Sequence, residues 1–217
     1  MEMSSMHPSG GWAPKVVAFD FDGVVVDSQE ANVRFYNHVL EHVGAAPVRE
    51  EQREYIHCHS HRESLEFLLG TGEDLESAIR FCRTIDFSMF NPYVRLEPSL
   101  VKLLEFLPPR YHVAMATNRT MSLPGVLRHL GIHDHFELLV TPNDTVRPKP
   151  HPDAMSVILG HFGARPEEVL YVGDSEVDEK FAQASGVIFA AYKNPKLTAH
   201  YQVAHFDQMI EFLGNNG

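Results

Sequence analysis

Two aspartates one residue apart, followed at once by a glycine, have the types and spacing most suggestive of chemistry. Asp20 and Asp22 end an apolar run that starts at Val16 and has the length of a buried strand. Open α/β sheets place their ligand sites at the carboxyl ends of the strands. Two close carboxylates repel each other unless a cation or a shared proton reduces the charge. The pair suggests a divalent metal, a carboxylate nucleophile or both, and an ordinary Asp-Gly turn is the alternative.

Two further segments carry groups that suit a phosphate. Thr117-Asn118-Arg119 follows an apolar run, and a hydroxyl with backbone N–H groups at a strand end suits a phosphate oxygen. The alternative is that Thr117 only caps a turn. Lys149 lies between two prolines that hold it in an extended stretch. A lysine held there could neutralise a transferring phosphoryl group, although it could equally be a solvated loop residue.

A last segment, Gly173-Asp174-Ser175-Glu176-Val177-Asp178, follows another apolar run. Its spacing puts Asp174 at a strand end and Asp178 one helical turn further on. Both carboxylates could face a cation that prefers oxygen ligands, such as Mg²⁺. The alternative is a helix N-terminus that favours acidic residues.

The elements that must position these residues alternate between strands and helices. Strands are predicted at 15–19, 111–116, 136–140, 168–172 and 187–191, and helices at 98–107, 123–130, 152–162, 177–184 and 206–213. This alternation favours an α/β fold with a Rossmann-like parallel sheet covered by helices on both faces. Residues 28–92 contain no convincing strand, so we expect a small all-helical domain there. The expected organisation is a flexible leader at 1–14, a core at 15–27 and 93–217, and the helical insertion at 28–92.

Taken together and in this order, the motifs resemble those of the haloacid dehalogenase-like hydrolase superfamily. The resemblance covers about residues 15 to 195 and includes a helical cap inserted after the first motif. One small departure is Val24, where many members have threonine. The matching motifs are Asp20-x-Asp22-Gly23, Thr117, Lys149 and Gly173-Asp174-x-x-x-Asp178.

The resemblance implies a role for each motif residue. Asp20 would be the nucleophile that forms an aspartyl phosphate, and Asp22 the general acid and base. Mg²⁺ would be held by the Asp20 carboxylate, the Asp22 backbone carbonyl and Asp174, with Asp178 orienting a metal-bound water or the lysine. The phosphoryl oxygens would be bound by Thr117, the Asn118 backbone and Lys149.

Three functions remain open at this stage. Within the superfamily that the chain resembles, an aspartate at position 22 favours phosphate chemistry over dehalogenation, so the resemblance implies a phosphatase acting on a small phosphorylated metabolite. A phosphomutase of the β-phosphoglucomutase type would use the same aspartyl phosphate. A non-catalytic phosphate-binding protein is disfavoured because it has no need of all the motif residues. The substrate and the oligomeric state cannot be read from the sequence.

The composition restricts the partners and the compartment. A formal net charge of -11 disfavours nucleic acid and anionic membrane surfaces. No apolar run is long enough to span a bilayer, and the first residues lack the apolar core of a signal peptide. With only Cys58 and Cys82, whose redox state is open, a reducing cytoplasm is the simpler expectation. The histidines of His57-Cys58-His59-Ser60-His61 do not match a zinc pattern, and we interpret them as part of the cap, with substrate contact as the alternative.

Overall fold

The computed structural model describes residues 12, 14–119 and 122–215, and these form two compact units. The core unit contains the chain up to Val26 and from Leu96 onward, and the helical unit contains Asp27–Arg95. The predicted insertion at 28–92 falls within the helical unit. Most of the predicted leader lies outside the described residues. Its Trp12 donates a hydrogen bond to the carbonyl of Glu167 and stacks on Tyr201 and Phe212, so this residue packs on the core unit.

The core unit is built on a six-stranded parallel sheet in the order β5-β4-β1-β6-β7-β8. The predicted strands agree with the observed ones to within two residues at each end. Strand β8 was not predicted, because three residues with a polar residue in the middle carry little pattern. The strands of this sheet are β1 (Val16–Phe19), β4 (His112–Ala116), β5 (Leu138–Val140), β6 (Val169–Gly173), β7 (Ile188–Tyr192) and β8 (Tyr201–Val203).

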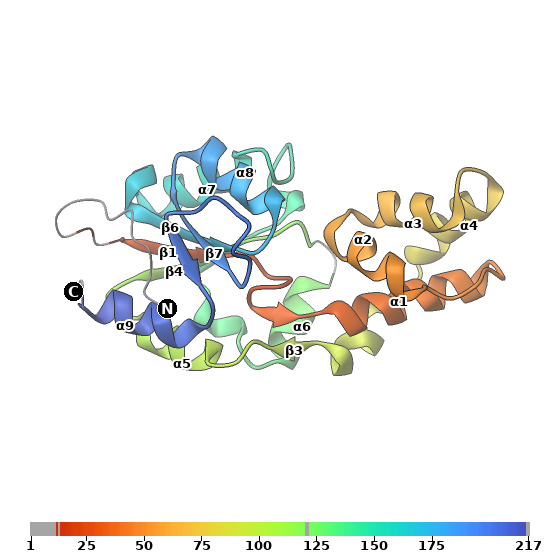
Figure 1. Ribbon diagram of the computed structural model, residues 1–217, viewed down its shortest axis with the longest axis horizontal. Helices are drawn as coiled ribbons and strands as arrows, with labels where there is room; N and C mark the ends of the chain where they lie inside the picture. The colour runs from red at the N-terminus through yellow and green to blue at the C-terminus, as the bar shows by residue number, and fades with distance from the viewer. Residues whose placement is uncertain (1–11, 13, 120–121, 216–217) are drawn as a thin grey trace. The chain divides into compact units, whose positions relative to one another are not determined.

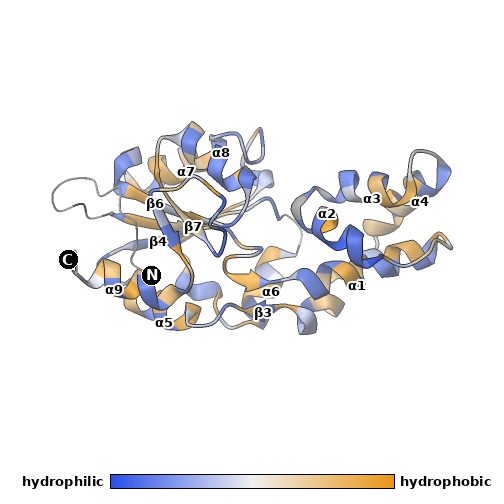
Figure 2. Ribbon diagram, viewed as in Figure 1, coloured by the Kyte–Doolittle hydropathy of each residue, from blue (hydrophilic) through white to orange (hydrophobic). Residues whose placement is uncertain are grey.

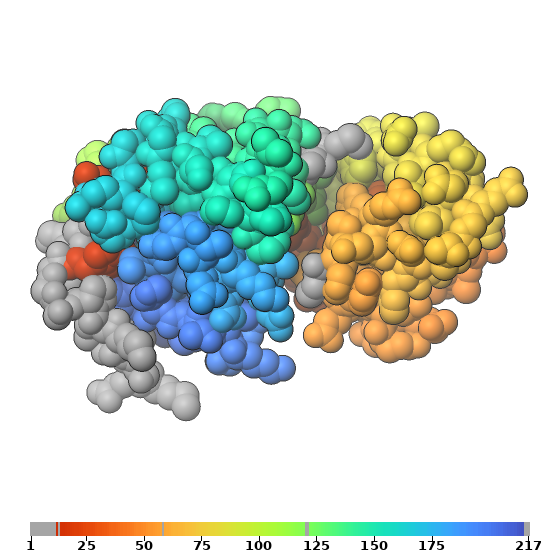
Figure 3. Space-filling model, turned by 90° about the horizontal axis from the view of Figure 1, so that it is seen from above, coloured from red at the N-terminus to blue at the C-terminus, as the bar shows by residue number. Residues whose placement is uncertain are grey.

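Helices cover both faces of this sheet. In Figure 1, α7 and α8 lie on one side of the strands, and α5 and α9 lie on the other. Figure 3 views the molecule from the first side, where the segments that carry α7 and α8 cover the sheet. The predicted α/β fold is therefore confirmed. The core helices are α5 (Leu100–Phe106), α6 (Leu123–His129), α7 (Asp153–Phe162), α8 (Glu176–Ser185) and α9 (Phe206–Asn215), with short 3₁₀ turns at His133–His135, Pro142–Asp144 and Pro166–Glu168.

Strand β1 lies in the middle of the sheet, and its burial fits that position. All four of its residues are fully buried, as expected for a strand with neighbours on both edges and helices on both faces. The hydropathy colouring in Figure 2 shows apolar residues along the strands of the core unit. The apolar run ends at Asp20, so the first polar residue of the chain after β1 emerges at the carboxyl edge of the central strand.

The helical unit has its own aromatic core. The ring of Phe35 on α1 contacts the rings of His61, Phe87 and Phe90 at centroid distances between 4.9 and 5.8 Å. The helices of this unit are α1 (Gln29–His42), α2 (Arg53–Cys58), α3 (His61–Leu69) and α4 (Glu73–Cys82), with 3₁₀ turns at Glu50–Gln52 and Phe87–Tyr93. A two-stranded sheet of β2 (Val26–Asp27) and β3 (Arg95–Leu96) lies where the chain passes between the core unit and the helical unit.

The histidine segment of the helical unit makes local contacts. His57 Nδ1 lies 3.1 Å from the side-chain nitrogen of Asn32, and the ring of His59 stacks on Tyr55 at 3.8 Å. Among the described residues, none of the histidines belongs to a group that could hold a metal. Cys82 is a free thiol, and burial raises its pKa to about 11. None of the helices in the described part of the chain combines the length and apolar character needed to cross a bilayer.

Candidate active site

The carboxyl edge of the sheet brings the predicted site residues of the core unit together. Phe19 pairs with Met115 of β4 on one side and with Val172 of β6 on the other. This register places the residues that follow β4 and β6 beside those that follow β1. Asp20 is 8% exposed, and its backbone N–H donates to the carbonyl of Val172 at 2.9 Å. The central strand therefore holds the candidate nucleophile in a buried position.

Lys149 lies at the centre of the site. Its ammonium lies 2.8 Å from Asp20 Oδ1, 2.7 Å from Asp178 Oδ1 and 2.9 Å from the Tyr171 hydroxyl, and its side chain is 3% exposed. Burial alone would lower the pKa of Lys149, but the carboxylates of Asp178 and Asp20 raise it above its ordinary value. The lysine therefore remains a buried cation that links two of the aspartates.

The backbone of Lys149 is held by a neighbouring loop. The Asn118 side chain accepts a hydrogen bond from the Lys149 N–H at 3.0 Å and donates one to the Lys149 carbonyl at 3.1 Å. Thr117 is buried, and its hydroxyl accepts a hydrogen bond from the Arg119 N–H at 3.1 Å. Hydrogen bonds of the Asn118 side-chain amide thus connect the two predicted phosphate-binding segments, which contain Thr117 and Lys149.

Asp178 is fully buried, and both of its carboxylate oxygens accept hydrogen bonds. One carboxylate oxygen accepts from Lys149 and from the Tyr171 hydroxyl, and the other accepts from the N–H groups of Asp174 and Ser175 and from the Ser175 hydroxyl. Ser175 and Asp178 also form the capping box that begins α8. Although burial opposes it, the pairing with Lys149 lowers the pKa of Asp178. This arrangement suits a residue that orients its neighbours.

Asp174 packs against a glycine that the turn after β1 requires. A Cβ added to Gly23 would lie 2.0 Å from Asp174 Oδ2, and the φ angle of Gly23 is +80°. Side chains rarely adopt that conformation, so both the backbone and the close approach require glycine here. Within the described residues, the Asp174 carboxylate accepts no hydrogen bond. Burial, together with the charges of Asp178 and Asp20, raises its pKa to about 8.

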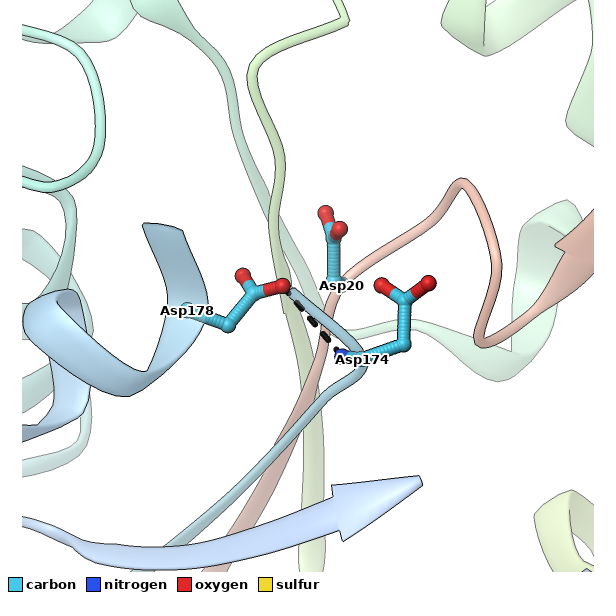
Figure 4. A group of neighbouring side chains, drawn as sticks. All are labelled: Asp20, Asp174 and Asp178. Carbon is cyan, nitrogen blue, oxygen red and sulfur yellow. Dashed lines mark hydrogen bonds between the residues drawn. The ribbon is translucent and has the colours of Figure 1, made fainter. Parts of the chain in front are cut away.

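The acidic residues fit a divalent cation. Asp20, Asp174 and Asp178 each offer a carboxylate oxygen, and these oxygens lie within 4.8 Å of one another (Figure 4). Burial raises the pKa of Asp20 to about 7 against the opposing effect of Lys149, and the charges of Asp178 and Asp22 add to the increase. If all three are ionised, Lys149 balances one charge, and a divalent cation would balance the other two. Oxygen ligands suit Mg²⁺ or Ca²⁺.

The side chain of Asp22 is directed to a different partner. Its two carboxylate oxygens accept hydrogen bonds from Nε and Nη2 of Arg119 at 3.0 and 2.9 Å. Asp22 does not belong to the group of described carboxylates that could hold a metal. The carbonyl contact that the resemblance assigns to Asp22 therefore stays a prediction, as do the roles of the other motif residues.

Sequence reasoning missed three residues of this site as contributors. Gly23 was quoted only as part of a motif, Arg119 only as part of the loop after β4, and Tyr171 only as part of a matching string. A tyrosine in an otherwise aliphatic buried strand was a usable signal, because a buried hydroxyl needs a partner. Nothing in the sequence indicated that Arg119 binds Asp22.

Comparison with known proteins gives consistent results. The chain is 28% identical to the phosphoglycolate phosphatase of Yersinia pestis, over 91% of this chain and 92% of that protein. It is 27% identical to the pyrophosphatase PpaX of Bacillus pumilus, over 78% and 79% of the two chains. A crystal structure of a HAD-superfamily hydrolase from Geobacter sulfurreducens matches with a TM-score of 0.82 and 38% identity, covering 95% of this chain and 99% of that one.

A family model matches most of the chain. The model of the haloacid dehalogenase-like hydrolases matches residues 17–192, which include every motif residue of the site. The match begins inside β1 and ends with β7, so it spans the central strands that position the site. The chain therefore belongs to the haloacid dehalogenase-like hydrolase family.

Proposed function

We propose that this enzyme is a Mg²⁺-dependent phosphatase that hydrolyses a small phosphorylated metabolite through an aspartyl phosphate on Asp20. The observation that carries the proposal is the buried Asp20 carboxylate, held 2.8 Å from Lys149 and next to Asp174. A buried nucleophile beside a fixed cation and a candidate metal ligand suits attack on an anionic phosphate ester. The phosphatase and pyrophosphatase relatives support this class of reaction.

The reaction would proceed in two displacements at phosphorus. In the first, an Asp20 oxygen forms a bond to phosphorus, the bond to the leaving oxygen breaks, and Asp22 gives that oxygen a proton. In the second, a water oxygen attacks phosphorus, the bond to Asp20 breaks, and Asp22 takes the proton from the water. Inorganic phosphate is released and both aspartates return to their starting states.

The remaining residues would bind the phosphoryl oxygens and the cation. Lys149, the Thr117 hydroxyl and the Asn118 backbone N–H would contact the oxygens of the phosphoryl group. Mg²⁺ would be held by the carboxylates of Asp20 and Asp174 and by the Asp22 carbonyl. When bound, the ion supplies positive charge that offsets the repulsion between carboxylate and phosphate. Asp178 would keep Lys149 charged and in place.

The relatives and the charge of the chain support the proposed substrate class. Phosphoglycolate is the first candidate, because the Yersinia pestis relative carries that name. A net charge of -11 supports a small metabolite in preference to nucleic acid or a membrane surface. We propose the cytoplasm as the compartment.

The proposal is tested by phosphate release from a panel of phosphomonoesters with Mg²⁺. Phosphoglycolate, sugar phosphates and nucleoside monophosphates would be compared by kcat/KM. We expect turnover by the natural protein and loss of turnover in Asp20→Asn. Asp134→Asn is the matched control, because Asp134 is a fully exposed aspartate of the same unit. Activity that survives Asp20→Asn overturns the nucleophile. Isomerisation of a sugar phosphate that requires a bisphosphate primer, with little phosphate release, would identify a mutase instead.

A further inference from the structure

Arg119 and Asp22 form a two-point ion pair that the proposed reaction does not explain. Nε and Nη2 of the guanidinium donate to the two oxygens of one carboxylate, which is the fork geometry in which arginine binds carboxylates most strongly. The side chains of Arg119 and Asp22 are 17% and 26% exposed. Partial burial reduces the screening of the two charges by solvent. This pair therefore holds the Asp22 carboxylate in its orientation more firmly than an exposed pair would.

The guanidinium is itself held from its other side. Nη1 of Arg119 donates to the hydroxyl of Ser122 at 3.0 Å, and the guanidinium carbon lies 5.2 Å from the centre of the Phe21 ring. The backbone N–H of Arg119 donates to the Thr117 hydroxyl at 3.1 Å. Every nitrogen of the residue therefore has a protein partner, and Ser122 and the Phe21 ring hold the guanidinium independently of Asp22.

This arrangement connects two parts of the candidate site. Arg119 comes two residues after Thr117 on the loop after β4, and Asp22 lies on the turn after β1. We propose that Arg119 is a positioning residue that orients the Asp22 carboxyl group for proton transfer at the leaving oxygen. When Asp22 acts as the acid, its proton would occupy one carboxyl oxygen in place of one guanidinium contact, and the other oxygen would still accept from Arg119. The inference rests on the proposed function, because it assigns a task to the proposed general acid. The occupied guanidinium argues against a primary role in binding the phosphoryl group.

A positioning role through Asp22 predicts a dependence on the leaving group. An alkyl phosphate has a basic leaving oxygen that needs a proton, whereas p-nitrophenyl phosphate releases a stable phenolate and needs little help. Arg119→Met should lower kcat/KM for an alkyl phosphate about 10- to 100-fold, a share of the usual contribution of a general acid. The loss of kcat/KM with p-nitrophenyl phosphate should stay within about threefold. We use kcat/KM because it reports the first displacement, whereas the second displacement is the same for both esters and would lower kcat equally.

Three further variants separate the effects of the two-point geometry, of the positive charge and of folding. Arg119→Lys keeps the charge without the two-point geometry and should recover only part of the lost kcat/KM. Ser122→Ala removes the support at Nη1 but keeps both members of the pair, so it should show a smaller loss with the same leaving-group dependence. Arg165→Met is the control, because Arg165 pairs with Glu168 before the amino end of β6, away from the site edge. Matching urea midpoints would show that the variants fold.

The double variant gives the most direct test of the coupling. If Arg119 acts through Asp22, then Arg119→Met in an Asp22→Asn background should cost no further activity with the alkyl phosphate. Equal losses of kcat/KM for both esters, or additive losses in the double variant, would overturn the inference while leaving the phosphatase proposal intact. If the natural protein turns over neither ester, both proposals fail.

Discussion

Lys149 and Asp178 form the most deeply buried ion pair of the site, with 2.7 Å between Nζ and Oδ1 and side chains that are 3% and 0% exposed. Tyr171 adds its hydroxyl to the same carboxylate oxygen at 2.7 Å. A buried pair of this kind is not by itself strongly stabilising, but removal of the carboxylate leaves buried donors without a charged acceptor. The pair therefore makes the stability of the core unit depend on a residue of the candidate site.

Asp178→Asn should lower the free energy of unfolding by about 1 to 3 kcal/mol, because buried donors of Lys149, Asp174 and Ser175 lose a charged acceptor while Asp20 still compensates the lysine. Urea unfolding measures this change. Asp153→Asn is the matched control, since Asp153 pairs at 2.8 Å with Arg147, whose side chain is 56% exposed, and the variant should cause a smaller loss. Similar losses in the two variants would show that burial does not distinguish the pairs.

Gly23→Ala should reduce both activity and metal binding. The added Cβ would lie 2.0 Å from Asp174 Oδ2 on a backbone with φ of +80°, so the turn or the carboxylate must move. The stability loss should exceed about 1 kcal/mol. Gly131→Ala separates the two causes, because its φ is +71° but the added Cβ meets nothing within 4 Å. A similar loss of activity in Gly131→Ala would contradict the close-approach argument.

The raised pKa of Asp174 predicts that the stability of the metal-free protein depends on pH. With its pKa raised from 3.8 to about 8, the folded chain keeps a proton that the unfolded chain has lost across this range. The free energy of unfolding should therefore fall as the pH rises from about 4 to 8, and Asp20, with a pKa of about 7, contributes in the same direction. Urea unfolding in a chelator at pH 5 to 8 measures the slope. Asp174→Asn should flatten it, and an unchanged slope would refute the assignment.

The same crowded charge predicts stabilisation by a divalent cation. At a Mg²⁺ concentration about 100 times its Kd, binding should add about 2.7 kcal/mol, which raises Tm by roughly 5–10 °C for a chain of this size. The shift should disappear in Asp174→Asn and persist in Asp134→Asn. Thermal unfolding with and without Mg²⁺ provides this readout independently of activity. A shift that survives in Asp174→Asn would place the ion elsewhere.

The sequence was sufficient to predict which residues meet at the edge of the sheet, but not the hydrogen bonds between their side chains. Asp20 and Asp174 follow apolar runs, and strand ends of a parallel sheet meet at one edge, so their proximity could be predicted. The binding of Asp22 to Arg119 and the double hydrogen bond from Asn118 to Lys149 depend on side-chain rotamers and on the approach of separate loops. Neither leaves a periodic signal in the chain. Strand β8 escaped prediction for a related reason, because its three residues are too few to show a period.

The central claim is that Asp20 carries the phosphoryl group during turnover. The most direct measurement is acid quenching of the enzyme during turnover of its best ester, followed by peptide mass spectrometry. We predict a phosphorylated aspartate at position 20, present with Mg²⁺ and substrate and absent in Asp20→Asn. Steady turnover with no phosphorylated peptide, together with activity retained in Asp20→Asn, would contradict the account.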